Sequence, residues 1–93
     1  MPRIQKDIFI KNPQGLHARP AVLFVQIASK YTANVVIEKD DVKVDGRSIM
    51  GILTLGAGSE STVRLTCDGE DAEALFAELE ELLMRDNIDE EQQ

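Results

Sequence analysis

Residues 15–21 read Gly-Leu-His-Ala-Arg-Pro-Ala, and they contain His17, the one histidine among the 93 residues of the chain. The residues before this stretch, 11–15, are rich in turn formers. The residues after it place apolar side chains at helical spacing, at Ala18, Ala21, Val22, Val25 and Ala28. The stretch is therefore predicted to join a loop to a helix, with His17 at the first turn. Pro20 suits this position because the backbone N–H groups of a first turn have no partner inside the helix.

This position gives His17 a specific chemical environment. The start of a helix presents unpaired N–H donors and the positive end of the helix dipole, which together favour an anion. Arg19 adds a planar, charged fork that matches phosphate oxygens. A nucleophilic ring, an anion cradle and an arginine within three residues indicate a phosphoryl acceptor. The spacing alone leaves open the alternative that His17 is an ordinary surface histidine or a substitute for a capping residue.

Length and composition limit the remaining possibilities. Ninety-three residues predict a single domain, 1–93, in which the polar residues 87–93 are expected to fray. No segment approaches the roughly 20 apolar residues that a membrane span requires, so no membrane insertion is expected. The lone Cys67 and the lack of an apolar signal-like stretch at the N-terminus favour the cytoplasm. One histidine and one cysteine cannot complete a metal shell, so no metal and no cofactor are predicted.

The net charge of −7 is unevenly distributed. Residues 1–67 carry nine Lys and Arg against six Asp and Glu, whereas residues 68–93 carry one Arg against eleven acids. This split argues against nucleic acid as the main partner. It leaves a mildly basic half that could meet acidic partner proteins. The acidic last quarter is interpreted as a solvated helix face followed by a frayed end.

The hydrophobic pattern predicts seven elements along the chain. Strands are expected at 4–10, 34–38, 42–45 and 62–67, and helices at about 18–31, 48–54 and 72–83. Asp71 is expected to cap the last helix. Asp40-Asp41 forms the hairpin turn between the second and third strands, and a looser turn than Asn-Gly would give is expected there. Helices on one side of a mostly antiparallel sheet make an α+β domain of two layers.

The short helix after Ser48 is unusually apolar. Ser48 precedes the run as a normal N-cap. The run is too apolar all round for a surface helix of one or two turns; its apolar members are Ile49, Met50, Ile52, Leu53 and Leu55. Either the helix is fully buried, or part of it forms an exposed docking patch around Met50, whose thioether adapts to several partners. Cys67 falls on the apolar face of the last strand and is expected to be buried and unreactive.

Residues 15–21 resemble the active-site motif of the HPr family, the histidine-containing phosphocarriers of the bacterial phosphoenolpyruvate-dependent sugar phosphotransferase system. Residues 47–56, Arg-Ser-Ile-Met-Gly-Ile-Leu-Thr-Leu-Gly, are similar to the regulatory-serine segment of that family. The resemblance extends from about Lys6 to about Arg85. It implies an open-faced β-sandwich with a four-stranded, mostly antiparallel sheet of order 1-4-2-3, covered on one face by three helices. One departure is Glu60, which stands where many relatives have glycine.

The resemblance also implies a mechanism. His17 would accept a phosphoryl group on Nδ1 from phosphorylated enzyme I and pass it to an enzyme IIA, with Arg19 steadying the phosphoryl oxygens. The protein would then be a carrier rather than an enzyme. Ser48 matches the serine that HPr kinase/phosphorylase modifies, and a transcriptional regulator is a further partner in this scheme. The residues expected to dock partners are Arg47, Ile49, Met50 and Leu53.

Other functions remain open on the sequence alone. The nitrogen-related branch of the phosphotransferase system uses a carrier with the same fold and histidine, directed to a regulatory enzyme IIA. A purely regulatory interaction module with this fold is a second alternative, although the presence of both His17 and Arg19 counts against it. A ferredoxin-like small-molecule sensor fits the element count only loosely and leaves residues 15–21 unexplained.

Overall fold

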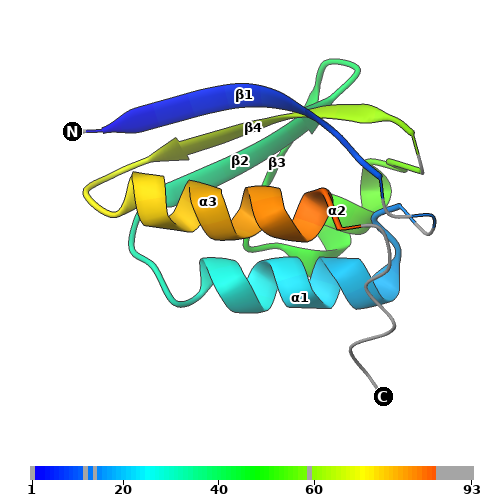
Figure 1. Ribbon diagram of the computed structural model, residues 1–93. Helices are drawn as coiled ribbons and strands as arrows, with labels where there is room; N and C mark the ends of the chain where they lie inside the picture. Colours follow the sequence, from blue (N-terminus) through cyan, green and yellow to red (C-terminus); the bar gives the residue numbers. More distant parts are fainter. Residues whose placement is uncertain (1, 12, 14, 59, 86–93) are drawn as a thin grey trace.

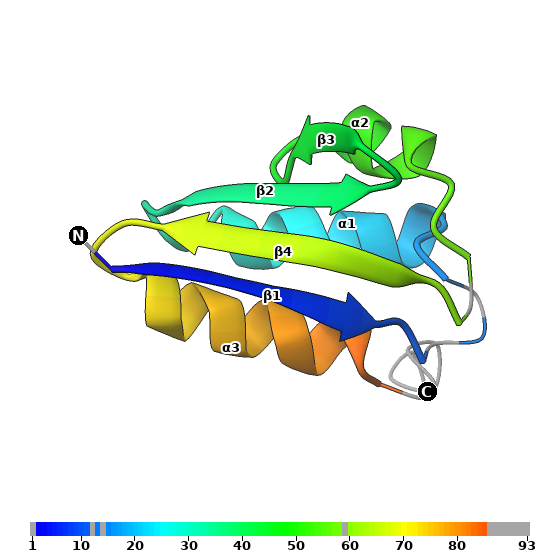
Figure 2. The same ribbon diagram turned by 90° about the horizontal axis from the view of Figure 1, so that it is seen from above.

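A four-stranded antiparallel sheet forms one layer of the protein. The computed structural model describes residues 2–11, 13, 15–58 and 60–85, so the expectation that residues 87–93 fray lies outside the described residues. Its strands are β1 (Arg3–Phe9), β2 (Asn34–Lys39), β3 (Val42–Asp45) and β4 (Thr62–Asp68), in the spatial order β1-β4-β2-β3 (Figure 2). All three pairings between neighbouring strands are antiparallel. The predicted strand order and the α+β class are confirmed.

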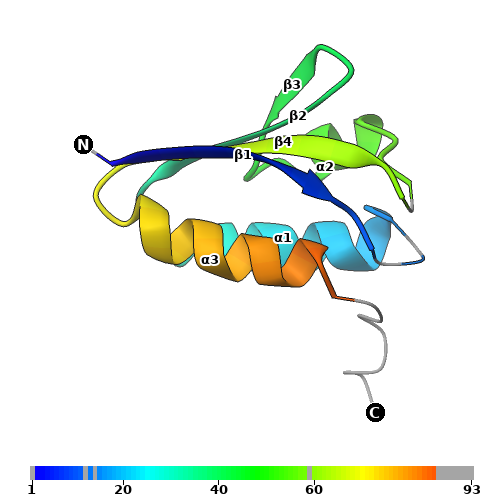
Figure 3. The same cartoon turned by 45° about the horizontal axis from the view of Figure 1, so that its top comes forward.

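Three helices cover one face of this sheet and leave the other face open. They are α1 (Ala18–Ala28), α2 (Ile49–Thr54) and α3 (Ala72–Leu83), and Figures 1 and 3 show all three on the same side. Alternation along β4 sends Val63, Leu65 and Cys67 toward the helices, where each is at most 1% exposed. The core between the layers also takes the apolar stripes of α1 and α3. His17 lies at the start of α1, at the edge of this core.

The first helix is shorter than predicted. It ends at Ala28 rather than Tyr31, and the N–H groups of Lys30 and Tyr31 turn back to the carbonyls of Ile27 and Ala28. The guanidinium of Arg47 donates to the carbonyls of Ala28 and Tyr31 at 2.8 and 2.6 Å. The carbonyl of Ala28 at the end of the helix and that of Tyr31 beyond it thus bond to a side chain from outside the helix.

Asp71 is the N-cap residue of α3, but its side chain makes no capping hydrogen bond to that helix. Its carboxylate instead accepts the backbone N–H groups of Thr32 and Ala33 at 2.9 and 2.8 Å, and the Thr32 hydroxyl at 3.3 Å. The expected capping interaction is therefore wrong. The carboxylate ties the α1–β2 connection to α3, and these hydrogen bonds hold the pKa of Asp71 below its ordinary value.

The β2–β3 hairpin is tighter than the sequence suggested. Lys39 pairs directly with Val42, so only two residues make the turn. Asp40 and Asp41 adopt φ values of +52° and +70°, the left-handed backbone of a type I′ turn. Strand pairing on both sides thus imposes on two aspartates the conformation that Asn-Gly adopts most readily. Glu60 likewise has φ +66°, which a glycine would adopt without strain.

Candidate functional site

His17 is the N-cap residue of α1. Its backbone is extended, its carbonyl accepts the N–H of Ala21 at 2.9 Å, and its side chain makes no capping hydrogen bond. The residue is exposed. Ala18 and Arg19 are the first two helical residues, whose N–H groups have no partner within a helix. The histidine is therefore exposed at the start of the helix, the position that the sequence predicted, next to N–H groups that have no partner inside α1.

The loop before His17 is fastened to a loop from the other half of the chain. The N–H of Leu16 donates to the carbonyl of Ala57 at 2.8 Å, and the Leu16 side chain is buried. Gly15 has φ +65°, and a Cβ at this position would lie 2.6 Å from the Ala57 carbonyl oxygen. Glycine is needed here for both the conformation and the close backbone approach.

A small depression adjoins the histidine. Its volume is about 120 Å³, and it is lined by Leu16, His17, Leu53, Gly56, Ala57 and Gly58. The structure thus brings His17 and Leu53 to one concave surface between the start of α1 and the end of α2. The sequence marks residues 56–60 as a loop but gives no sign that this loop forms a wall beside His17. That relation depends on the hydrogen bond between Leu16 and Ala57, which are distant in the chain.

Arg19 lies in the first turn of α1 and is exposed. Within the described ranges, no acidic side chain forms an ion pair with its guanidinium. The first turn of α1 contains no acidic residue. The fork of Arg19 is therefore available for an anionic group of a partner or for a phosphoryl group on the neighbouring ring.

Ser48 is the N-cap of α2, as predicted. Its Oγ accepts the N–H of Gly51 at 2.9 Å, and the residue is half-buried. Part of its surface remains accessible next to two exposed apolar residues, Ile49 and Met50. The hydroxyl therefore stabilises the helix start and also lies at the edge of an exposed surface.

The apolar residues of α2 are divided between core and surface. Ile52 and Leu55 are buried, whereas Met50 is 71% exposed, Ile49 38% and Leu53 36%. We call the exposed set of Ile49, Met50 and Leu53 the α2 patch. A short helix cannot bury residues that lie on all of its sides, so part of this apolar surface faces solvent.

Arg47 differs from the other residues that were expected to dock partners. Its guanidinium is partly buried and donates to the two carbonyls at the end of α1. Its backbone N–H donates to the Asp45 carboxylate at 2.9 Å. Arg47 thus connects the start of α2 to the end of α1, and we do not include it in the α2 patch.

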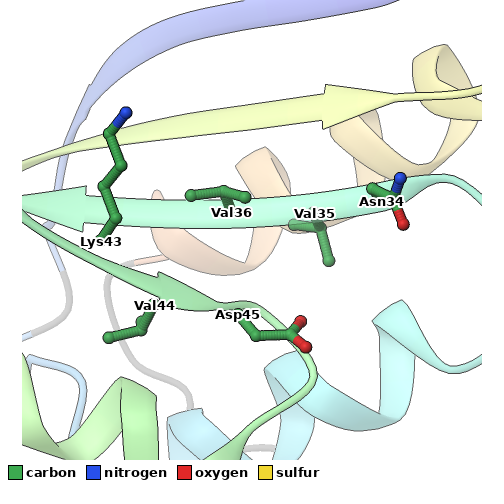
Figure 4. Close-up of a pocket in the computed structure, with 6 residues that line it drawn as sticks. All are labelled: Asn34, Val35, Val36, Lys43, Val44 and Asp45. Atoms are coloured by element: carbon green, nitrogen blue, oxygen red, sulfur yellow. The ribbon is translucent and has the colours of Figure 1, made fainter.

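A larger groove lies elsewhere, along β2 and β3. It encloses about 460 Å³ and is lined by Asn34, Val35, Val36, Lys43, Val44 and Asp45 (Figure 4). Figure 4 shows Lys43 at one end of the groove and the polar atoms of Asn34 and Asp45 at the other. None of the predicted site residues lines it, so size alone does not identify the functional site.

Other kinds of site find no support in the described residues. Across 2–11, 13, 15–58 and 60–85, no three or more His, Cys, Asp and Glu side chains gather as a metal site would require. None of the described helices is long and apolar enough to cross a membrane. Burial raises the pKa of the Cys67 thiol to about 11, so this side chain is a packed hydrophobe with little thiolate character.

Comparison with known proteins supports the family suggested by the two motifs. The family described as the PTS HPr component phosphorylation site matches residues 4–85. The HPr-like protein Crh of Halalkalibacterium halodurans is 46% identical over 81 residues, covering 83% of this chain and 96% of the relative. The phosphocarrier protein HPr of Treponema pallidum is 35% identical, covering 85% and 90%. The crystal structure of HPr from Bacillus anthracis superposes with a TM-score of 0.86 at 39% identity, covering 90% of this chain and all of that one.

Proposed function

This chain belongs to the HPr family of phosphotransferase-system phosphocarriers, and from this premise we propose that His17 is its phosphoryl acceptor. Enzyme I is the donor and an enzyme IIA is the acceptor, in the branch of the system that serves sugar uptake. The observation that carries the proposal is the position of His17. It is exposed, is the N-cap residue of α1, and shares a depression with Leu53 of the exposed α2 patch.

The chemistry follows from what this chain supplies. The bond that holds the phosphoryl group on enzyme I breaks as a P–N bond forms at Nδ1 of His17. In a second transfer this P–N bond breaks as the phosphoryl group bonds to enzyme IIA, and His17 is free again. Phosphoryl transfer needs positioning and charge stabilisation more than covalent machinery. Arg19 and the N–H donors at the start of α1 supply positive potential beside the ring. The partner completes the site, because an exposed His17 is shielded from water only when a second protein covers it.

The α2 patch supplies the docking surface in this proposal. A cluster of exposed apolar side chains beside the reacting ring gives donor and acceptor the same place to bind. Met50, the most exposed of the three, can adjust its flexible side chain to different partners. Shared use of one surface means that donor and acceptor bind in turn, which suits a carrier.

Ser48 is proposed as a regulatory phosphorylation site within this surface. A phosphate on its Oγ would add about two negative charges next to Ile49 and Met50. That charge would weaken apolar docking there or create a binding site for a regulator. HPr kinase/phosphorylase is the enzyme that would add it.

The deciding experiment is the intact mass of the purified protein after incubation with phosphoenolpyruvate, magnesium and enzyme I. We expect a gain of one phosphate that brief acid removes. His17→Ala should abolish the gain, whereas the matched control Ser48→Ala should retain it. No gain with an enzyme I that is active on its own HPr would overturn the proposal.

A regulatory interaction module is the second candidate. The observation behind it is that the relatives of this chain include HPr-like proteins named Crh, one of them 46% identical. The same mass assay distinguishes the two candidates. An acid-stable gain that requires ATP and the kinase, without any acid-labile gain at His17, would establish the regulatory module.

A further inference from the structure

Three glycines lie around His17, one in the loop before it and two in the wall of its depression. Gly15 has φ +65°, and a Cβ on it would lie 2.6 Å from the Ala57 carbonyl oxygen and from the Cα of Gly58. Gly56 has φ +64°, a left-handed conformation in which a Cβ causes strain. The fold therefore explains why Gly15 and Gly56 are glycines.

Gly58 has no comparable reason to be glycine. Its backbone lies outside the left-handed region, so a residue with a side chain can adopt it. Apart from its chain neighbours, no atom of the described residues lies within 4 Å of a Cβ built on Gly58. Its carbonyl accepts the N–H and the hydroxyl of Ser61 at 3.3 and 2.5 Å, and a side chain would leave this acceptor in place. Glycine also loses more backbone freedom on folding than alanine would, so it costs stability here.

The position of Gly58 offers a different explanation. It forms part of the wall of the depression beside His17, together with the apolar side chains of Leu16, Leu53 and Ala57. An apolar cavity of about 150 Å³ accepts a molecule of the size of benzene. The depression encloses about 120 Å³, which suits one aliphatic side chain. A side chain on Gly58 would add atoms to this wall and narrow the space.

We propose that the depression receives an aliphatic side chain of enzyme I and that Gly58, by lacking a side chain, keeps it open. Leu53 belongs both to the depression and to the α2 patch, so a partner that covers the patch also covers the depression. The apolar lining favours an aliphatic group, because a polar group would lose its hydrogen bonds to water there. This inference rests on the proposed function, which makes enzyme I the phosphoryl donor.

The inserted side chain has a consequence for the transfer. It lies next to the His17 ring and excludes water from that side of it, which protects the reacting group. Residue 58 then determines specificity, because the size of its side chain sets which partner side chains fit. A large residue at this position excludes a partner that inserts an aliphatic group.

The first test requires no partner protein. Isobutanol carries the branched apolar group of a leucine side chain, and amide chemical shifts measured by NMR report where it binds. We expect it to shift the amides of Leu16 and of residues 53–58 in the wild type. Gly58→Leu should remove these shifts, because its own side chain occupies the depression. The matched control Thr62→Leu adds the same side chain at an exposed position of β4 and should retain them.

Affinity for enzyme I gives a second readout. Gly58→Leu should weaken binding about tenfold or more, the scale on which an inserted side chain disturbs a packed contact. Gly58→Ala should weaken it by less than about fivefold, and Thr62→Leu should stay within about twofold of the wild type. The thermal midpoint of Gly58→Ala should equal or exceed that of the wild type, which separates loss of binding from a folding defect.

Two results would overturn the inference. One is the absence of isobutanol shifts at these amides in the wild type, or shifts that Gly58→Leu retains. The other is an equal loss of affinity in Gly58→Leu and Thr62→Leu. The isobutanol map requires neither enzyme I nor phosphoryl transfer, so its failure is distinct from a failure of His17 to accept phosphate.

Discussion

The open face of the sheet and the surface made by Arg19 and the α2 patch, which we call the α1–α2 face, are both exposed, but they arrange their side chains in opposite ways. On the open face a row of alternating charge crosses all four strands. In this row Asp7 lies opposite Arg64, Arg64 opposite Glu38, and Glu38 opposite Lys43. Arg64 donates to Asp7 at 2.9 Å, which raises the pKa of the guanidinium. The row holds two acids and two bases, and each charge lies opposite one of the other sign, so the row carries no net charge.

The α1–α2 face has no such pairing. It combines three exposed apolar residues with the available fork of Arg19. Exposure of a single hydrophobic residue does not distinguish the two faces, because Phe9 on the open face is 48% exposed and Leu53 is 36% exposed. The difference lies in the neighbours: Phe9 lies beside polar strand residues, whereas Leu53 adjoins His17 and other apolar side chains. Docking surfaces are therefore recognised by grouping and not by single exposed residues.

The largest expected effect comes from placing a charge on each face. Met50→Asp should weaken binding to enzyme I about ten- to hundredfold, because a central apolar contact becomes a desolvated carboxylate. Phe9→Asp, at an exposed apolar position on the open face, should leave binding unchanged. Titration calorimetry measures both, with thermal unfolding as the check on folding. Equal losses in the two variants would remove the distinction between the faces.

Arg47 tests where the α1–α2 face ends. Arg47→Met should lower the free energy of unfolding by about 1–3 kcal/mol, because two carbonyls lose charged donors. Its affinity for enzyme I should stay within about twofold of the wild type, on the scale of exposed charges. Arg19→Met should do the reverse, with unchanged stability and slower phosphoryl transfer. Denaturant unfolding and transfer rates separate the two roles, and weaker binding in Arg47→Met at unchanged stability would return Arg47 to the docking surface.

Acid should reduce the stability that two carboxylates provide near the end of α1 away from His17. The hydrogen bonds from Thr32 and Ala33 lower the pKa of Asp71, and those from Lys30 and Tyr31 lower the pKa of Glu78. A lowered pKa in the folded state gives stability that is present above the unfolded value near 4 and is lost as pH falls through the folded value. Asp71→Asn should therefore be less stable than wild type at pH 7, and the difference should shrink below about pH 4. Unfolding curves across this range measure it; a difference independent of pH would exclude the carboxylate as its source.

The smallest effect is expected at the hairpin, remote from the surface that we propose for docking. Asp41→Gly should stabilise the protein by about 0.5–1 kcal/mol, because φ +70° is strained for aspartate and free for glycine. Asp41→Ala should give no such gain. Neither change should affect phosphoryl transfer. If Asp41→Ala raises the stability as much as Asp41→Gly does, then the charge of Asp41, and not its backbone conformation, destabilises the turn.

The sequence predicted most of the fold because its patterns are local. The helical spacing after His17 and the alternation in residues 62–67 each follow from one element packing one face on a core. Ser48 as an N-cap was equally local, since its acceptor role involves the N–H of Gly51 three residues later. The predictions that failed concern groups whose hydrogen-bond partners lie far away in the chain. The first helix ends at Ala28 rather than Tyr31, and Arg47 bonds to the Ala28 carbonyl there. Asp71 bonds to Thr32 and Ala33 instead of its own helix.

By itself the sequence determined the two-layer α+β domain and put its one histidine at the start of a helix with an arginine two residues later. Backbone periodicity and capping chemistry require only neighbouring residues, and they are visible in the chain. Only the tertiary structure decided which apolar residues of α2 remain exposed, and that the loop 56–58 forms a wall beside His17. It also decided that Asp40 and Asp41 make a tight turn, since pairing of Lys39 with Val42 closes the hairpin around them. These outcomes depend on packing between segments far apart in the chain, whose combined energy exceeds the local preference of any single residue.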